Sequence, residues 1–346
     1  MTVLFFVGNG FDLNVGLKTR FKDVLPFYIE EPTNNDVVKE FKKIIDRNID
    51  TWANFEEHIG LYTDEIQKKE TTIETVLDFI NCMFDFKKFL KSYLQNEEIK
   101  AKYDNTQEIA KIFKKSLLSF TECLNSDPKI LLDEIDKDVI RFSYINFNYT
   151  TVFDNCLEIL KKSNIFQLEK RNKTGFFSGV IYGHNDLGKV LHIHGTLDNN
   201  MILGVNDQKQ IKNTWFRNQE KLNAYIKPNA NEALENHRNT EAIKLLEDAN
   251  IYCIFGMSLG KTDKKWWVEI CKQLINFPEK QLVIYAYDET LDASFPENTL
   301  EAIDYYKIIF LNHLRFSEFD KDDLKERIKK NIHVAINKDI FKMELI

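Results

Sequence analysis

The sequence predicts an α/β fold in which a mostly parallel sheet carries helices on both faces and a helical insertion. Short apolar runs bounded by glycine or polar residues are typical of strands buried on both faces of a sheet. Such runs lie at 3–7, 139–147, 190–194, 201–205, 251–255, 282–286 and 308–311. Long helical patterns separate most of these runs, as expected for a Rossmann-like sheet.

The stretch 35–137 departs from this alternation. Its apolar residues recur at helical spacing, and no strand-like run interrupts them. We therefore predict a Rossmann-like nucleotide-binding core from 1–34 and 138–315, a helical insertion at 35–137, and a C-terminal helix and tail at 316–346. Smaller predicted features are helices near 232–247 and 263–275 and a polar loop at 170–175.

Composition favours a folded protein of a reducing compartment. Hydrophobic residues make up 43% of the 346 residues, enough for a sizeable core, and the five cysteines form no Cys-x-x-Cys pair. The formal net charge of −7 argues against stable binding to nucleic acid, which favours a basic surface. No apolar run approaches the roughly 18 residues of a membrane-spanning helix, so we predict a cytoplasmic protein without a membrane partner.

The first candidate site follows the first predicted strand, where Gly8-Asn9-Gly10-Phe11-Asp12 leads into a helix. A glycine turn at this point leaves backbone N–H groups at a helix N-terminus, and such groups attract phosphate. Glycine also permits the close approach of a ligand. We therefore predict that residues 8–12 bind a nucleotide, and an ordinary strand-to-helix turn is the alternative.

Two further candidates lie at the ends of the second and third predicted strands. Asn148 would face a ligand, because open α/β sheets bind ligands beyond the carboxyl ends of their strands, or it would cap the next helix. His192 and His194 would share one strand face. His194, which precedes Gly195, suits a general base near neutral pH, with a structural histidine as the alternative. No partner stands at metal-ligand spacing, so no metal is predicted.

The fourth turn follows the strand at 251–255 and contains Gly256, Ser258 and Asp263. These residues would add donors to the same ligand, or Asp263 would cap the helix that follows. Glu56 joins the candidates only if its helix folds over the site. Because all four turns follow predicted strands, we predict that they converge on one cleft.

These residues together resemble the AbiH family of bacteriophage abortive infection proteins. The resemblance rests on a Gly-Asn-Gly-Phe-Asp-Leu motif from Gly8, a Trp-x-x-Phe-Glu motif ending at Glu56, Phe-Asn-Tyr-Thr around Asn148, Ile-His-Gly at His194, and Gly-x-Ser-Leu-Gly from Gly256. It implies a role in defence against phage.

The same turns are more distantly similar to sirtuin-type NAD-binding domains. The glycine turn, Asn148 and His194-Gly195 parallel motifs of those domains, and this similarity implies NAD as a substrate that is hydrolysed. In this comparison His194 is the general base and Asn148 orients the ribose or a water. Thr150 replaces an aspartate of the sirtuin motif, and zinc-binding cysteines are absent, which counts against protein deacylation.

Three functions are compatible with these residues. The first is an NAD glycohydrolase in which Asp12 and Glu56 stabilise positive charge at the sugar. The second is a nucleotide- or phage-sensing module that acts through a partner. The third is a nuclease whose Asp12, Glu56 and Asp263 hold a divalent metal. The sequence leaves open the phage trigger and the oligomeric state, a homo-oligomer included.

Overall fold

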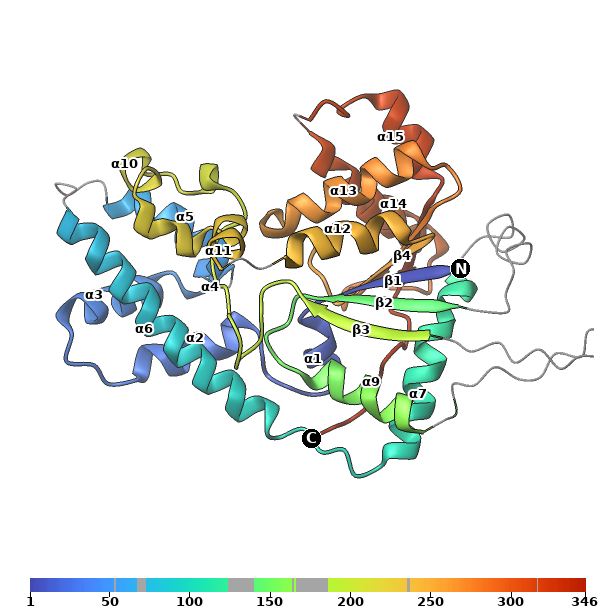
Figure 1. Cartoon of the computed structure of the whole chain (residues 1–346), viewed down its shortest axis with the longest axis horizontal. Helices are drawn as coiled ribbons and strands as arrows, with labels where there is room; N and C mark the ends of the chain where they lie inside the picture. Colours follow the sequence, from blue (N-terminus) through green and yellow to red (C-terminus); the bar gives the residue numbers. More distant parts are fainter. Residues whose placement is uncertain are drawn as a thin grey trace, which may run out of the picture.

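The computed structural model of the chain describes residues 1–52, 54–66, 73–123, 140–163, 165, 186–234, 237–315 and 317–346. These residues form a sheet covered by helices and, beside it, a unit of helices (Figure 1). The loop predicted at 170–175 lies outside them. No helix in the described part of the chain has both the length and the apolar character needed to cross a membrane.

The described strands form one sheet of six, all parallel, in the order β3-β2-β1-β4-β5-β6. This is the strand order of the doubly wound Rossmann fold, so the predicted Rossmann-like class is confirmed. The inner strands β1, β4 and β5 are almost wholly buried, as their continuous apolar runs predict. The strands are β1 (Thr2–Val7), β2 (Arg141–Asn146), β3 (Asp186–His192), β4 (Ile251–Phe255), β5 (Gln281–Ala286) and β6 (Ile332–Ile336).

Helices cover both faces of the sheet because side chains alternate along each strand. Phe5 of β1 packs into a cluster with α1, α7, α9 and the C-terminal Phe341, and Phe6 packs on the opposite face against α12, α13, α14 and α15. The helices are α1 (Gly10–Asn14), α7 (Thr106–Leu118), α9 (Val152–Lys162), α12 (Arg238–Asp248), α13 (Lys264–Asn276), α14 (Pro296–Leu311) and α15 (Asp322–Lys329). Short 3-10 helices are η1 (Ser119–Cys123), η2 (Gln208–Gln210), η4 (Lys261–Asp263) and η5 (Asn312–Leu314).

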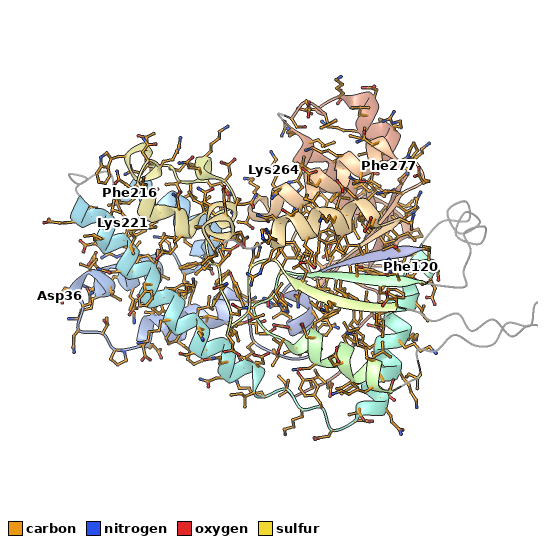
Figure 2. The ribbon with its side chains drawn as sticks, in the orientation of Figure 1. Asp36, Phe120, Phe216, Lys221, Lys264 and Phe277 are labelled. Carbon is orange, nitrogen blue, oxygen red and sulfur yellow. The ribbon has the colours of Figure 1, made fainter. Side chains whose placement is uncertain are left out.

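A separate hydrophobic cluster holds the helical unit together. Phe55 stacks on Phe86 with ring centroids 3.8 Å apart, and Figure 2 marks Phe216 in this unit and Phe120 at the sheet. The unit contains α2 (Phe21–Glu30), α3 (Asp36–Arg47), α4 (Ile49–Trp52), α5 (Phe55–Ile66), α6 (Ile73–Glu98), α10 (Thr214–Arg217) and η3 (Glu220–Tyr225). Since it draws on segments before β2 and after β3, the boundaries of the predicted insertion stay a prediction.

Two predicted strands are wrong. The run 201–205 has only an isolated bridge among the described residues, from Val205 to Ile226, and its apolar side chains fill the cluster of the helical unit. The run 308–311 forms the last turn of α14. A short apolar run does not distinguish a strand from the buried end of a helix, which is why both predictions failed.

The sixth strand, β6, lies inside the stretch predicted as a helix and tail. His333 interrupts its apolar run, and the ring Nε2 of His333 lies 3.0 Å from Oε1 of Gln281 within the sheet. The helix predicted at 232–247 is two helices, α11 (Lys227–Ala233) and α12. These differences leave the central strands, which carry the candidate site, as predicted.

Candidate functional site

The predicted glycine turns after β1 and β4 touch each other where the strand order reverses. A Cβ atom on Gly10 would lie 2.4 Å from Cα of Gly256, and one on Gly8 would lie 2.5 Å from the Gly256 carbonyl oxygen. Gly256 has a φ of +69°, a conformation that favours glycine. A side chain on any of these glycines would push the two turns apart.

Three backbone N–H groups of the first turn already have partners within the protein. Those of Gly8 and Gly10 donate to the carbonyl oxygens of Phe255 and Gly256, each over 2.9 Å, and that of Phe11 donates to Gly8 over 2.9 Å. The expectation that the turn presents free N–H groups to a phosphate is therefore wrong for these three groups, because the turn is bonded to its neighbour. The helix that follows, α1, is five residues long. Nucleotide binding by residues 8–12 stays a prediction.

The side chains of Asn9, Phe11 and Ser258 in these turns have different surroundings. The Asn9 side chain does not cap α1; its Nδ2 donates to the Thr19 carbonyl over 3.1 Å, and its Oδ1 accepts from the Thr19 hydroxyl over 2.6 Å. The Phe11 ring is buried and lies against Phe153, with centroids 5.1 Å apart. Ser258 is exposed, so its hydroxyl faces solvent at the edge of the junction.

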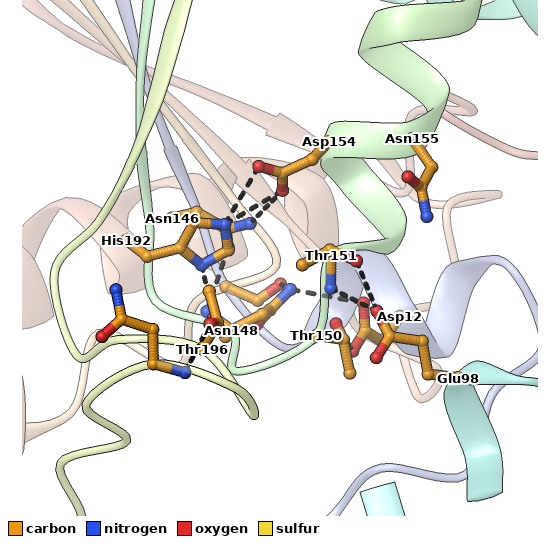
Figure 3. A network of polar contacts seen from close by, with 12 residues as sticks. Asp12, Glu98, Asn146, Asn148, Thr150, Thr151, Asp154, Asn155, His192 and Thr196 are labelled. Carbon is orange, nitrogen blue, oxygen red and sulfur yellow. Dashed lines mark hydrogen bonds and ion pairs between the residues drawn. The ribbon is translucent and has the colours of Figure 1, made fainter. Parts of the chain in front are cut away.

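Asp12 is a buried carboxyl group at the centre of this edge of the sheet. Its Oδ2 accepts from the Thr150 hydroxyl over 2.7 Å, and its Oδ1 lies 3.4 Å from Nδ2 of Asn148 (Figure 3). Its side chain is buried, and this burial raises its pKa to about 7, with the charge of Glu98 adding to the rise. Asp12 therefore exchanges a proton near neutral pH.

Asn148 joins β2 to the glycine turn. Its Nδ2 donates to the Gly8 carbonyl over 3.1 Å, and its backbone N–H donates to Oδ1 of Asn146 over 3.0 Å. Thr151, not Asn148, occupies the N-cap position of α9. Asn148 is thus buried beside Asp12 at the carboxyl ends of β1 and β2, as its sequence position predicts.

His192 is a functional candidate that the sequence analysis set aside. Its Nε2 lies 3.0 Å from Oδ2 of Asp154 in the first turn of α9, and its Nδ1 lies 2.9 Å from the Asn148 carbonyl oxygen (Figure 3). Both ring nitrogens therefore face acceptors, which suits the doubly protonated ring. Burial alone would lower the His192 pKa, but Asp154 outweighs burial and raises it.

His194 faces a different set of partners. It lies beyond the end of β3, so the expectation that both histidines share a strand face is wrong. Its Nε2 is 3.2 Å from Oδ1 of Asp263, and its ring packs edge-on to Phe147. Asp263 holds the N-cap position of α13 but makes no capping bond, because its carboxylate is turned to His194.

A buried lysine completes this second cluster. Nζ of Lys227 in α11 lies 2.8 Å from Oε2 of Glu56 and 3.7 Å from Oδ1 of Asp263. Burial would raise the Asp263 pKa, but Lys227 and His194 outweigh burial and hold it at about 2. Glu56 lies in α5, so its helix folds over the site as the candidate required. Ala53 of its motif lies outside the described residues.

His194 keeps one ring nitrogen available. Burial and the charge of Lys227 lower its pKa, so the ring is neutral near pH 7 and donates Nε2–H to Asp263. Its Nδ1 is then an acceptor, and this buried atom has no hydrogen-bond partner among the described residues. Gly195 turns the chain directly after it, with a φ of +77°.

The four predicted turns are therefore in contact at one edge of the sheet. Sequence reasoning missed Asp154 and Lys227 because an acid in a first helical turn and a lysine beside a proline are common surface residues. Of the predicted aspartates, Asp12 lies beside Asn148 and Thr150, and Asp263 lies beside His194 and Lys227. No group of three or more histidine, cysteine or acidic side chains in the described part of the chain is arranged to hold a metal ion.

Comparison with protein-family models matches the chain to the family described as bacteriophage abortive infection AbiH, over residues 4–285. It gives no support to the sirtuin-like similarity. A search of curated proteins finds no match. The matched range extends from β1 through β5 and includes every turn of the candidate site. The chain belongs to the AbiH family of bacteriophage abortive infection proteins.

Proposed function

We propose that this AbiH protein defends the cell by hydrolysing the nicotinamide–ribose bond of NAD at the carboxyl edge of its sheet. The observation that carries the proposal is His194, a neutral imidazole whose Nε2 is fixed by Asp263 and whose buried Nδ1 lacks a partner among the described residues. A histidine oriented by a carboxylate through one nitrogen acts as a general base through the other.

The reaction adds one water to NAD. The bond between the ribose C1′ and the nicotinamide nitrogen breaks, and its electron pair leaves with nicotinamide. A water oxygen bonds to C1′ and yields ADP-ribose, while His194 Nδ1 takes the proton that the water loses. No oxidant or reductant is consumed.

The charges around His194 favour this transition state. The two carboxylates of Glu56 and Asp263 outnumber the single ammonium of Lys227, so the cluster carries net negative charge when His194 is neutral. An oxocarbenium-like sugar carries positive charge and is stabilised beside such a cluster. The positive charge of the bound nicotinamide ring is stabilised beside the cluster for the same reason.

The remaining predicted residues form the nucleotide side of the site. The ligand lies at the junction of the two glycine turns, where ligands bind in doubly wound sheets. Asn9, Gly10 and Ser258 supply its solvent-facing surface. Asn148 and the titrating carboxyl group of Asp12 lie next to this junction and contact the ribose.

The test is release of nicotinamide from NAD by purified protein, with and without extract of phage-infected cells. Wild type releases nicotinamide, and His194→Ala and Asp263→Asn lose at least a hundredfold in rate, the usual loss for a removed general base. His237→Ala, a change at an exposed histidine, keeps the wild-type rate. Full activity of His194→Ala would refute the assignment. NAD binding without turnover in every condition would favour a sensing module instead.

A further inference from the structure

The longest described helix, α6, ends at the site with two adjacent glutamates. Oε2 of Glu97 accepts from the backbone N–H of Lys18 over 3.0 Å, in the loop that follows α1. Oε1 of Glu98 accepts from both the backbone N–H and the hydroxyl of Thr151, over 2.6 and 2.7 Å. One helix end therefore holds both loops that flank Asp12.

The contact of Glu98 continues directly to Asp12. Thr151 is the residue after Thr150, whose hydroxyl donates to Asp12 (Figure 3). Fixing the backbone at Thr151 fixes the position of Thr150, since the two share a peptide plane. Glu98 thus determines where the Thr150 hydroxyl points without contacting Asp12 through a hydrogen bond of its own.

The rest of α6 belongs to the helical unit. Its 26 residues span roughly 39 Å at 1.5 Å per residue. Along this length the helix buries Val76, Phe79, Met83, Phe86 and Leu90 in the cluster of that unit. A shift of the unit therefore moves the same rigid helix that ends at Glu97 and Glu98 (Figure 1).

We infer that Glu98 is a positioning residue, which acts through Thr151 and Thr150 to set the geometry and charge around Asp12 and ties both to the helical unit. The inference rests on the proposed function only where enzymatic activity is the readout. By this inference, a displacement of the helical unit moves α6 and thereby changes the surroundings of Asp12.

Several charged or titratable groups besides Glu98 face Asp12. The negative charge of Glu98 adds to the rise in the Asp12 pKa that burial causes, and nearby Asp154 acts in the same direction while His192 opposes it. The titratable groups around Asp12 are Glu98 of α6, Tyr103 of the loop after α6, Asp154 and Cys156 of α9, and His192 of β3. Any test of Glu98 must therefore separate its charge from those of the other groups.

The experiment compares Glu98→Gln in the wild-type and Asp12→Asn backgrounds by urea unfolding from pH 5 to 8.5. Glutamine keeps the acceptor for Thr151 and removes the charge, so the pKa of Asp12 falls. In the wild-type background Glu98→Gln therefore gains stability relative to the parent as the pH rises. In the Asp12→Asn background this pH-dependent gain disappears. Glu74→Gln, at the exposed start of α6, shows no pH-dependent gain in either background.

A pH-independent effect of Glu98→Gln, equal in both backgrounds, would overturn the inference and leave Glu98 as a plain helix cap. Where wild type hydrolyses NAD, Glu98→Ala lowers kcat at least tenfold with little change in KM, and Glu98→Gln restores most of the rate with a shifted pH profile. If wild type shows no hydrolysis, the proposed function fails, and the unfolding comparison still decides the role of Glu98.

Discussion

Replacing Asp12 by asparagine removes a buried carboxyl group whose pKa is raised in the folded protein. The folded-state pKa of about 7 exceeds the ordinary value of 3.8. Such a group contributes stability that is fully present below the unfolded pKa and is lost as the pH rises through the folded pKa. At 1.36 kcal/mol per pKa unit, the loss between pH 5 and pH 8 is about 2–3 kcal/mol.

Asparagine is close in shape and keeps an oxygen for the Thr150 hydroxyl, but it does not ionise. The free energy of unfolding of Asp12→Asn therefore changes less with pH than that of wild type. The variant gains about 2–3 kcal/mol relative to wild type between pH 5 and pH 8. Subtracting the two curves cancels the titration of the other groups.

Urea denaturation followed by tryptophan fluorescence measures both curves. Asp36→Asn is the matched control, because Asp36 is exposed and its low pKa comes from a hydrogen bond with Lys39. That control gains no stability at pH 8 relative to pH 5. A difference between wild type and Asp12→Asn that stays constant from pH 5 to 8 would refute the argument, because it would mean that Asp12 is ionised throughout.

Three further outcomes follow from the contacts at the site. His192→Gln loses stability below pH 6.5, and because the pKa of His192 is raised, the loss shrinks as the pH rises through that pKa in urea titrations. Lys227→Met removes the ammonium between Glu56 and Asp263 and destabilises the fold by about 3–5 kcal/mol, with partial recovery on adding Glu56→Gln in a double-mutant cycle. Gly10→Ala lowers the melting temperature through its backbone clash, whereas Gly260→Ala, which meets only side-chain atoms at 3.3 Å or more, does not.

The central sheet could be predicted because the sequence pattern of its strands indicates that they are buried. β1, β4 and β5 are covered on both faces and show unbroken apolar runs with turns at their ends. The edge strand β6 pairs on one side only and tolerates His333 within it, so its pattern is weaker. The run at 308–311 has the composition of a strand, yet helix packing decides its structure.

Some features of the site also follow from the local sequence, whereas others depend on contacts between distant segments. Asn148, His194 and the glycine turns follow strands, and their position at the carboxyl edge could be read from the chain. The partner of each charge could not, because Asp154 and Asp263 meet the histidines, and Lys227 meets Asp263, only after distant segments pack together. For the same reason, the sequence could not show that the N–H groups of Gly8 and Gly10 bond to the turn after β4.

The two histidines show how packing assigns different chemistry to similar residues. Both ring nitrogens of His192 face acceptors, so it has no free nitrogen for catalysis. His194 faces one carboxylate, and burial together with the ammonium of Lys227 lowers its pKa. The two residues stand two positions apart, and only their partners distinguish them.

Lys227 makes the state of His194 depend on the helical unit. Glu56 of α5 lies 2.8 Å from the ammonium, in a position where the charge of Lys227 adds to the lowering of the His194 pKa that burial causes. If Glu56 withdrew with its helix and Lys227 followed, burial alone would oppose the attraction of Asp263 for an imidazolium, and the pKa of His194 would rise. A protonated His194 has no acceptor nitrogen, so the general-base role that we propose for it is favoured when Glu56 and Lys227 stay beside the sheet.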